Sequence, residues 1–211
     1  MLKYKSILDK LTDDQKTALL SDVAAFSDPH IASLGVPPIR TALLSSLAAE
    51  AGMPSYASMA AAWDLALIGQ VTQAAAVQAR AKGANLFVTP DLKCTSNDAV
   101  RGLSEDAFFN GETGAAMARA VRAAGGACAY ARLACDEKDV ACLDVNEDAR
   151  AIYDLVRKPF VQAAKSASPD AIVSSLDRPC GGYLGTNVRL FSDIVAGEYG
   201  KDVVALSQQL A

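Results

Sequence analysis

This chain has a single histidine, no long apolar run and no excess of positive charge. Zinc sites draw on several histidine and cysteine ligands, so the lone His30 argues against one. Surfaces that bind nucleic acid are basic, whereas 20 Lys and Arg face 24 Asp and Glu here and leave a net charge of −4. A spanning helix needs about 20 apolar residues. Neither nucleic acid nor a membrane is therefore expected as a partner.

The five cysteines are odd in number and widely spaced. No Cys-x-x-Cys pair occurs, and the seven-residue recurrence of Cys128, Cys135 and Cys142 does not match metal-site spacing. This pattern predicts reduced thiols, no metal and no cofactor, with a disulfide between Cys135 and Cys142 as the alternative. The first ten residues are too charged for a signal peptide. Taken as a natural start, they predict a cytoplasmic protein.

Helical signals recur along the chain. Thr12-Asp13-Asp14-Gln15 is typical of a capping box and predicts a helix over 12–26. An alanine-rich element over 56–82 is expected to end at Gly83. Asn110 opens a further helix that ends at Gly125-Gly126, and helices are expected over 146–165, with a kink at Pro159, and over 187–200.

Five short segments between these helices are expected to be strands: 36–44, 85–90, 127–131, 171–175 and 202–206. Strands that alternate with helices indicate parallel βα units, and no linker or repeat divides residues 1–211. A closed barrel of this kind has eight strands. The sequence therefore predicts a single α/β domain with an incomplete or open (β/α) TIM-type barrel. Its open edges at 39–44 and 203–206 predict a homodimer, or a partner chain that completes the barrel.

An ordered series of short motifs covers nearly the whole chain. They are Leu34-Gly35-Val36-Pro37-Pro38-Ile39-Arg40, Ala62-Trp63-Asp64, Ser104-Glu105-Asp106-Ala107, Asp148-Ala149-Arg150 and Gly197-Glu198-Tyr199-Gly200. In this order they resemble Leu-Gly-Ile-Pro-Pro-Leu-Arg and the later motifs of the N-terminal barrel domain of glycoside hydrolase family 3, a family of β-glucosidases. The resemblance implies a glycosidase-like barrel.

The resemblance fails at the positions where the family binds sugar. A sugar-holding aspartate becomes Leu43, and the nucleophile in the family's Ser-Asp-Trp becomes Gln208. The family's Gly-Arg, Lys-His and Tyr-Asn pairs are replaced by Asn97-Asp98, Ala131-Arg132 and Leu176-Asp177. A glutamine amide is neither anionic nor a useful nucleophile, so the covalent step of a retaining glycosidase has no agent.

Two other groups of residues are candidates for acid–base chemistry. His30 lies beside Asp28 in an expected loop and is a conceivable general base, although a solvated loop histidine is the preferred interpretation. Asp91, Asp177 and Glu105 follow strands or lie near their ends, and two of them would suffice for a glycosidase pair. A catalytic pair formed by two of these three carboxylates stays open as the alternative to a chain without catalytic residues.

Together these observations predict a domain related to β-glucosidases that is catalytically inactive and acts in binding or assembly. Carbohydrate is the candidate ligand, and its binding residues stay unassigned. The alternative is a fragment or subunit of an active O-glycosyl hydrolase of carbohydrate metabolism. In that case the remaining catalytic residues lie beyond Ala211 or in another chain.

Overall fold

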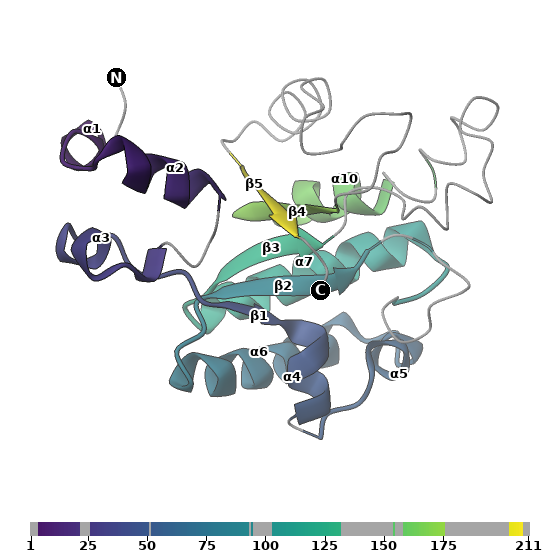
Figure 1. The fold of residues 1–211 in the computed structure, drawn as a ribbon. Helices are drawn as coiled ribbons and strands as arrows, with labels where there is room; N and C mark the ends of the chain where they lie inside the picture. Colours follow the sequence, from purple (N-terminus) through teal and green to yellow (C-terminus); the bar gives the residue numbers. More distant parts are fainter. Residues whose placement is uncertain are drawn as a thin grey trace.

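A computed structural model describes residues 4–21, 26–50, 52–92, 94, 103–131, 154, 158–175 and 203–208 (Figure 1). Its strands are β1 (Thr41–Leu43), β2 (Leu86–Asp91), β3 (Ala127–Ala131), β4 (Ala171–Ser175) and β5 (Val204–Gln208). Its helices are α1 (Lys5–Leu8), α2 (Asp13–Ser21), α3 (Pro29–Ser33), α4 (Leu44–Glu50), α5 (Tyr56–Ala61), α6 (Leu65–Ala81), α7 (Ala107–Ala123) and α10 (Lys158–Ser166).

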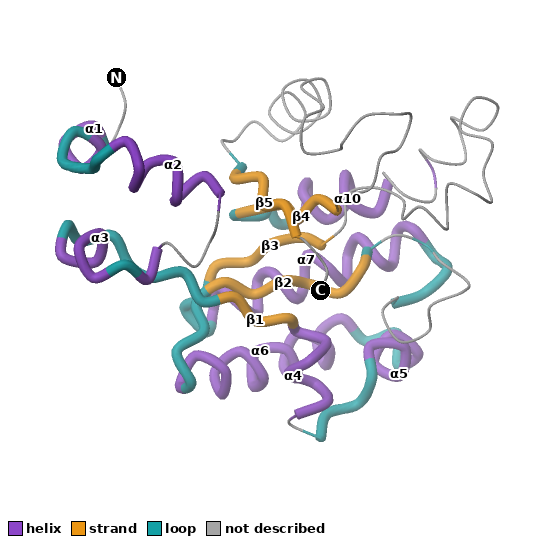
Figure 2. Tube along the Cα trace, in the orientation of Figure 1, coloured by secondary structure: helices purple, strands orange, loops and turns teal. Residues whose placement is uncertain are grey.

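The five strands form one sheet in the order β1-β2-β3-β4-β5, and every neighbouring pair is parallel (Figure 2). Each strand thus lies beside the strand that precedes it in the chain, as in a (β/α) barrel. Within the described residues β1 and β5 are the two edges of this sheet. The predicted α/β fold with an open or incomplete barrel is confirmed.

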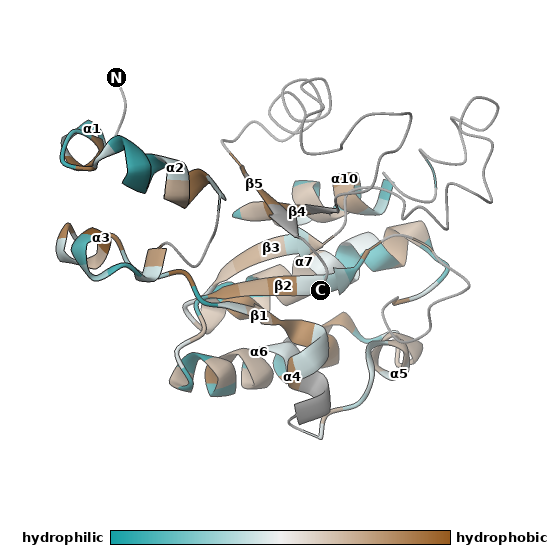
Figure 3. Cartoon of the chain, in the orientation of Figure 1, coloured by the Kyte–Doolittle hydropathy of each residue, from teal (hydrophilic) through white to brown (hydrophobic). Residues whose placement is uncertain are grey.

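Both faces of the central strands of the sheet are buried. Phe87, Tyr130 and Ile172 point to one face, where they join a large core beneath helices α4, α6, α7 and α10. The alternate residues point to the other face and form a smaller cluster of their own, which includes Val88 and Val173. Because these central strands are buried on both faces, most of their residues are apolar, as the brown colour over much of β2 and β3 shows (Figure 3).

The strand predictions are accurate in the centre of the sheet and less so at its edges. β3 and β4 have the predicted bounds, β2 is shifted by one residue, and β5 begins two residues later than expected. β1 is much shorter than the predicted 36–44. Pro37 and Pro38 have no N–H for a ladder, and the N–H of Arg40 is bound by the side-chain oxygen of Asn85 at 2.8 Å.

The long helix predicted over 56–82 is wrong, because the chain breaks it into α5 and α6. Trp63 adopts a left-handed conformation with φ of 49°, and the Asp64 carboxylate then caps α6 by accepting the N–H groups of Ala66 and Leu67. At the other end of α6, Gly83 has a positive φ of 97°, as expected of a helix terminator.

The other helix predictions hold in part. The capping box is confirmed, since Thr12 and Gln15 exchange backbone-to-side-chain hydrogen bonds of 3.0 and 3.2 Å. α2 ends at Ser21, and residues 22–25 lie outside the described residues. α7 starts at Ala107, earlier than predicted, because Asp106 caps it. Of the two later helices, only α10 is described. Pro159 is the second residue of α10, and residues 155–157, which would test the predicted kink, lie outside the described residues.

The crossing of α7 and α10 depends on Gly111. A Cβ atom at this position would lie 2.6 Å from Cβ of Gln162 and 2.8 Å from the carbonyl oxygen of Pro159. In contrast, a Cβ atom at Gly69 on α6 would meet nothing within 4 Å. The two glycines therefore form a matched pair, one in a tight crossing and one in open space.

We expect Gly111→Ala to lower the free energy of unfolding by about 1–3 kcal/mol, because the helices must move apart. Gly69→Ala is expected to raise it by about 0.5–1 kcal/mol, because alanine restricts the unfolded chain. Urea denaturation followed by circular dichroism measures both. A Gly111→Ala variant as stable as Gly69→Ala would contradict the tight crossing.

Candidate functional site at the strand ends

Because all five strands run in the same direction, their carboxyl ends meet at one edge of the sheet. The residues at these ends, called here the strand-end face, are Leu43, Asp91, Ala131, Ser175 and Gln208. Backbone register places Asp91 opposite Ala131 and Ser175 opposite Gln208. In (β/α) barrels this edge holds the catalytic and binding groups.

Of the five residues that end the described strands, Asp91 is the one with an ionisable side chain. Its side chain is only 6% exposed, which is unusual for a carboxylate. A bulge in β2 determines its position: Val88 pairs with Ala129 and Asp91 with Ala131, so Thr89 and Pro90 stand opposite one residue. Pro90 cannot donate a ladder hydrogen bond. The Thr89 hydroxyl instead accepts the N–H of Ala131 at 3.1 Å.

A polar network closes the start of α7 against the segment after β2. The Asn110 side chain is fully buried and donates to the carbonyl oxygen of Ser104 at 2.8 Å and to Sγ of Cys94 at 3.7 Å. The Ser104 hydroxyl donates in turn to Oδ1 of Asn110 at 2.6 Å. Burial, together with the negative charge of Asp106, raises the pKa of the Cys94 thiol to about 11. The Cys94 thiol is therefore protonated at neutral pH and is a poor nucleophile.

The described acid–base candidates differ in their surroundings. Glu105 is exposed before α7, and Asp177 lies outside the described residues. His30 is exposed on α3, not in the loop that the sequence predicted. Oδ1 of Asp28 accepts the backbone N–H groups of His30 and Ile31 at 2.7 and 3.3 Å. Asp28 thus serves as the cap of α3.

Three of the positions where the sequence departs from the family lie at strand ends. Leu43 ends β1 with 37% of its surface exposed, Ala131 ends β3 and is buried, and Gln208 ends β5. The other departures, at Asn97-Asp98, Arg132 and Leu176-Asp177, lie outside the described residues, as do Cys135 and Cys142. Cys128 is a buried strand residue, as predicted.

Sequence reasoning missed the bulge and the break at Trp63, although both leave a signal. Proline inside an apolar run points to a bulge, and Trp-Asp followed by an apolar segment marks a helix cap. Among the described residues no three His, Cys, Asp or Glu side chains are grouped for a metal, and no helix has the length and apolarity to cross a membrane.

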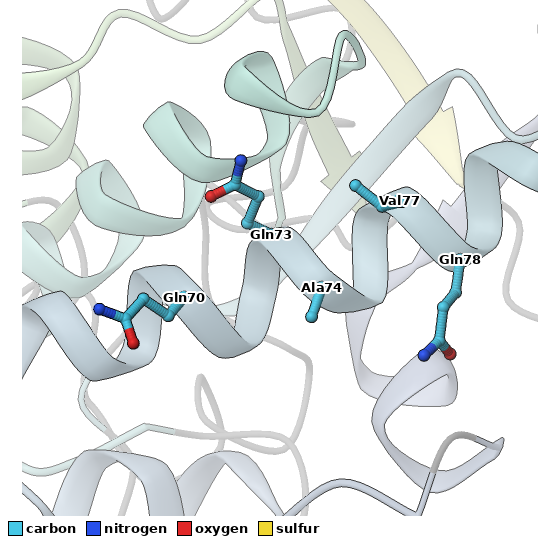
Figure 4. Close-up of a pocket in the computed structure, with 5 residues that line it drawn as sticks. All are labelled: Gln70, Gln73, Ala74, Val77 and Gln78. Carbon is cyan, nitrogen blue, oxygen red and sulfur yellow. The ribbon is translucent and has the colours of Figure 1, made fainter.

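A shallow groove on α6 is the other surface feature of note (Figure 4). It lies midway along the helix, away from the strand ends, and its lining holds no ionisable side chain: Gln70, Gln73, Ala74, Val77 and Gln78. Without an acid, base or nucleophile this groove offers no chemistry, so the strand-end face is the candidate site.

Comparisons with known proteins agree with this geometry. β-Glucosidase B of Emericella nidulans is 28% identical over 214 residues, which cover 94% of this chain and 25% of that protein. The structure of β-glucosidase 3B from Thermotoga neapolitana with glucose aligns with a TM-score of 0.61 and 20% identity, over 74% of this chain and 22% of that one. A family 3 glycosyl hydrolase from Mycobacterium smegmatis aligns with a TM-score of 0.63 and 13% identity, over 90% and 66% of the two chains. No family model matches the chain.

The fold and the strand-end face define an α/β protein with an open barrel of the glycosidase type. More particularly, the chain is related over most of its length to the β-glucosidases of glycoside hydrolase family 3, and the predicted resemblance is confirmed. It spans about 25% of the length of the first of these relatives.

One half-buried and one buried thiol, Cys94 and Cys128, make the stability of the fold sensitive to alkali. Burial raises the pKa of Cys94 to about 11 and that of Cys128 to about 12, from an ordinary value of 9.0. As the pH rises, the unfolded chain loses these protons first, so unfolding becomes more favourable. The stabilisation is complete below about pH 9 and is lost as the pH rises through about 11 for Cys94 and about 12 for Cys128.

We expect the urea midpoint to fall between about pH 8 and about pH 10. Cys94→Ala and Cys128→Ala are each expected to reduce this fall, whatever they do to stability at about pH 8. A midpoint that stays constant across this interval would show that the two thiols titrate normally in the folded protein.

Proposed function

We propose that this domain does not hydrolyse glycosides and instead recognises a carbohydrate at its strand-end face. The observation that carries the proposal is the residue at the end of β5, Gln208, where the related family has its nucleophilic aspartate. An amide cannot form the glycosyl-enzyme ester of a retaining mechanism.

The remaining carboxylates are a poor substitute for that nucleophile. A retaining glycosidase needs two carboxyl groups about 5–5.5 Å apart, one as nucleophile and one as acid and base. Asp91 is buried at the end of β2, and Glu105 is exposed on the segment before α7. Leu43 and Ala131 offer no hydrogen bonds from their side chains to orient a sugar, and orientation accounts for much of enzymatic rate.

A carbohydrate remains the ligand class best supported by the comparisons. The aligned structure of β-glucosidase 3B was determined with glucose. Binding without turnover needs only apolar and hydrogen-bonding contacts, and these survive the loss of a nucleophile. We therefore infer for this chain the ligand class of the related β-glucosidases, and not their reaction.

One observation favours a second candidate function. Because the chain matches 25% of the length of β-glucosidase B, it also fits a fragment or subunit of an active O-glycosyl hydrolase. Its missing catalytic groups would then come from another segment or another chain.

The purified chain is expected to release no nitrophenol from aryl β-glucosides above background, because Gln208 cannot act as the nucleophile. Asp91→Asn serves as the control. Turnover that disappears in Asp91→Asn would overturn the proposal and make Asp91 a catalytic residue.

The same assay on the Gln208→Asp variant is expected to stay at background, since the side chains of Leu43 and Ala131 would still fail to hold the sugar. Activity restored by this one substitution would favour the active fragment.

The open edges of the sheet lead us to propose that the chain forms a homodimer. Within the described residues β1 and β5 each pair with one strand only, and Val204 on β5 is 59% exposed. The outer strands of an open parallel sheet are templates for further pairing.

Light scattering at micromolar concentration is expected to give twice the mass of the chain. Val204→Lys is expected to give the monomer, because a lysine on an edge strand opposes pairing. Leu20→Lys on α2, where the side chain is 90% exposed and far from the edge in sequence, is the matched control and should leave the dimer intact. A monomeric parent chain would rule the dimer out.

A further inference from the structure

The single tryptophan of the chain is the most unusual surface residue in the described part. Trp63 is 65% exposed, and its φ of 49° makes it the one non-glycine residue with positive φ among the described residues. A bulky side chain in this conformation is strained, and such strain persists where the surroundings or a function demand it.

The turn between α5 and α6 does not itself require an indole. The Trp63 N–H bonds the carbonyl oxygen of Ala60 at 3.0 Å and ends α5, after which Asp64 caps α6. Glycine or asparagine makes the same left-handed turn with less strain. The reason for tryptophan must therefore lie in its side chain.

That side chain is held in place by a neighbouring helix. The indole stacks on the ring of Phe109, with 4.3 Å between centroids and 29° between planes. Phe109 is itself buried, and its N–H bonds the Asp106 carboxylate at 2.6 Å in the first turn of α7. One face of the indole is thus fixed against the protein, while much of the ring stays in contact with solvent. Phe108, beside it in the chain, is 61% exposed.

Chain direction places these aromatic rings at the rim of the strand-end face. α6 ends at Ala81, shortly before β2 begins, so its first residues lie about 25 Å away, towards the carboxyl ends of the strands. α7 follows the end of β2 and packs alongside α6. Figure 1 shows α5 and the first turn of α7 on the side to which β2 points.

We propose that Trp63, backed by the buried ring of Phe109, forms an aromatic platform whose exposed face stacks on a pyranose ring of a β-linked glucan. This inference rests on the proposed carbohydrate-binding function and gives it a location. The ring faces of β-linked glucose present axial C–H groups, which suit the electron-rich face of an indole, while the equatorial hydroxyls point outward. Glu105, exposed in the segment that precedes α7, supplies an acceptor for such hydroxyls.

The platform is also rigid before any ligand arrives. A ring already stacked on a buried phenylalanine and fixed by two helix caps loses little freedom on binding. This arrangement distinguishes Trp63 from exposed aliphatic residues such as Leu20 and Val77, which have no ring that could stack.

Because Trp63 is the only tryptophan, intrinsic fluorescence reports on the platform alone. Titration of the intact chain with cellopentaose is expected to give a saturable blue shift, and sorbitol, which has hydroxyls but no ring faces, should give none. Calorimetry with cellopentaose should show binding weakened about tenfold or more in Trp63→Asn and changed little in Trp63→Phe. Asparagine tolerates the left-handed backbone, so the first variant is expected to fold.

Leu20→Ala, on a distant exposed apolar residue, is the control and should bind as the parent does. Equal binding by the parent and Trp63→Asn, or no spectral change with cellopentaose, would overturn the platform. So would a blue shift that depends on protein concentration without sugar, since it would mean that a second copy covers the rings. The two proposals fail separately: glycoside turnover would refute inactivity alone, whereas loss of the Trp63 effect without turnover would refute the platform alone.

Discussion

Coverage of both faces of a parallel sheet is the constraint on which the rest of this structure depends. The helix-covered face buries Phe87, Tyr130 and Ile172. The opposite face buries small and branched side chains of the same strands, so alternate residues serve two separate cores. This double burial requires central strands that are mostly apolar and helices that pack against the sheet. The turn between α7 and β3 is also tightly packed, since a Cβ atom at Gly126 would lie 2.6 Å from the Phe87 ring.

The amino ends and the carboxyl ends of the strands have different roles. At the amino ends, the Asp170 carboxylate accepts the N–H of Cys128 at 2.9 Å and pairs with the Arg122 guanidinium at 3.1 Å. Arg122 also donates to the carbonyl oxygen of Ser168. These contacts tie α7 to the turn before β4 and thus stabilise the fold. The carboxyl ends carry the groups that differ from the related glycosidases. In (β/α) barrels this end holds the active site, whereas the amino ends serve stability.

A change of the strand-end residues is compatible with retention of the fold, because different residues determine the two. The helices and the two cores need apolar side chains, capping residues and close glycine contacts, and these are present. The strand-end face needs specific charged groups, and Leu43, Ala131 and Gln208 do not supply them. The buried Asp91 and the aromatic rings at the rim give this face features of its own.

Local patterns in the sequence were sufficient for the centre of the fold. β3 and β4 follow from short apolar runs between turn residues, and the Thr12 capping box follows from its spacing. The order of these elements also determined the parallel sheet. The strand-end position of Gln208 could be predicted in the same way, because a side chain that follows an apolar run in a βα unit must lie at that edge.

Tertiary structure alone decided the features that depend on contacts between distant segments. Asp91 is buried directly after the Pro90 bulge, where the hydroxyl of Thr89 in the same strand accepts the N–H of Ala131 in the next strand. Trp63 breaks an otherwise continuous helical pattern, and its ring finds Phe109, which is 46 residues further along the chain. Helix propensity could not foresee that break, since a stacking partner on another helix offsets the strain of the turn.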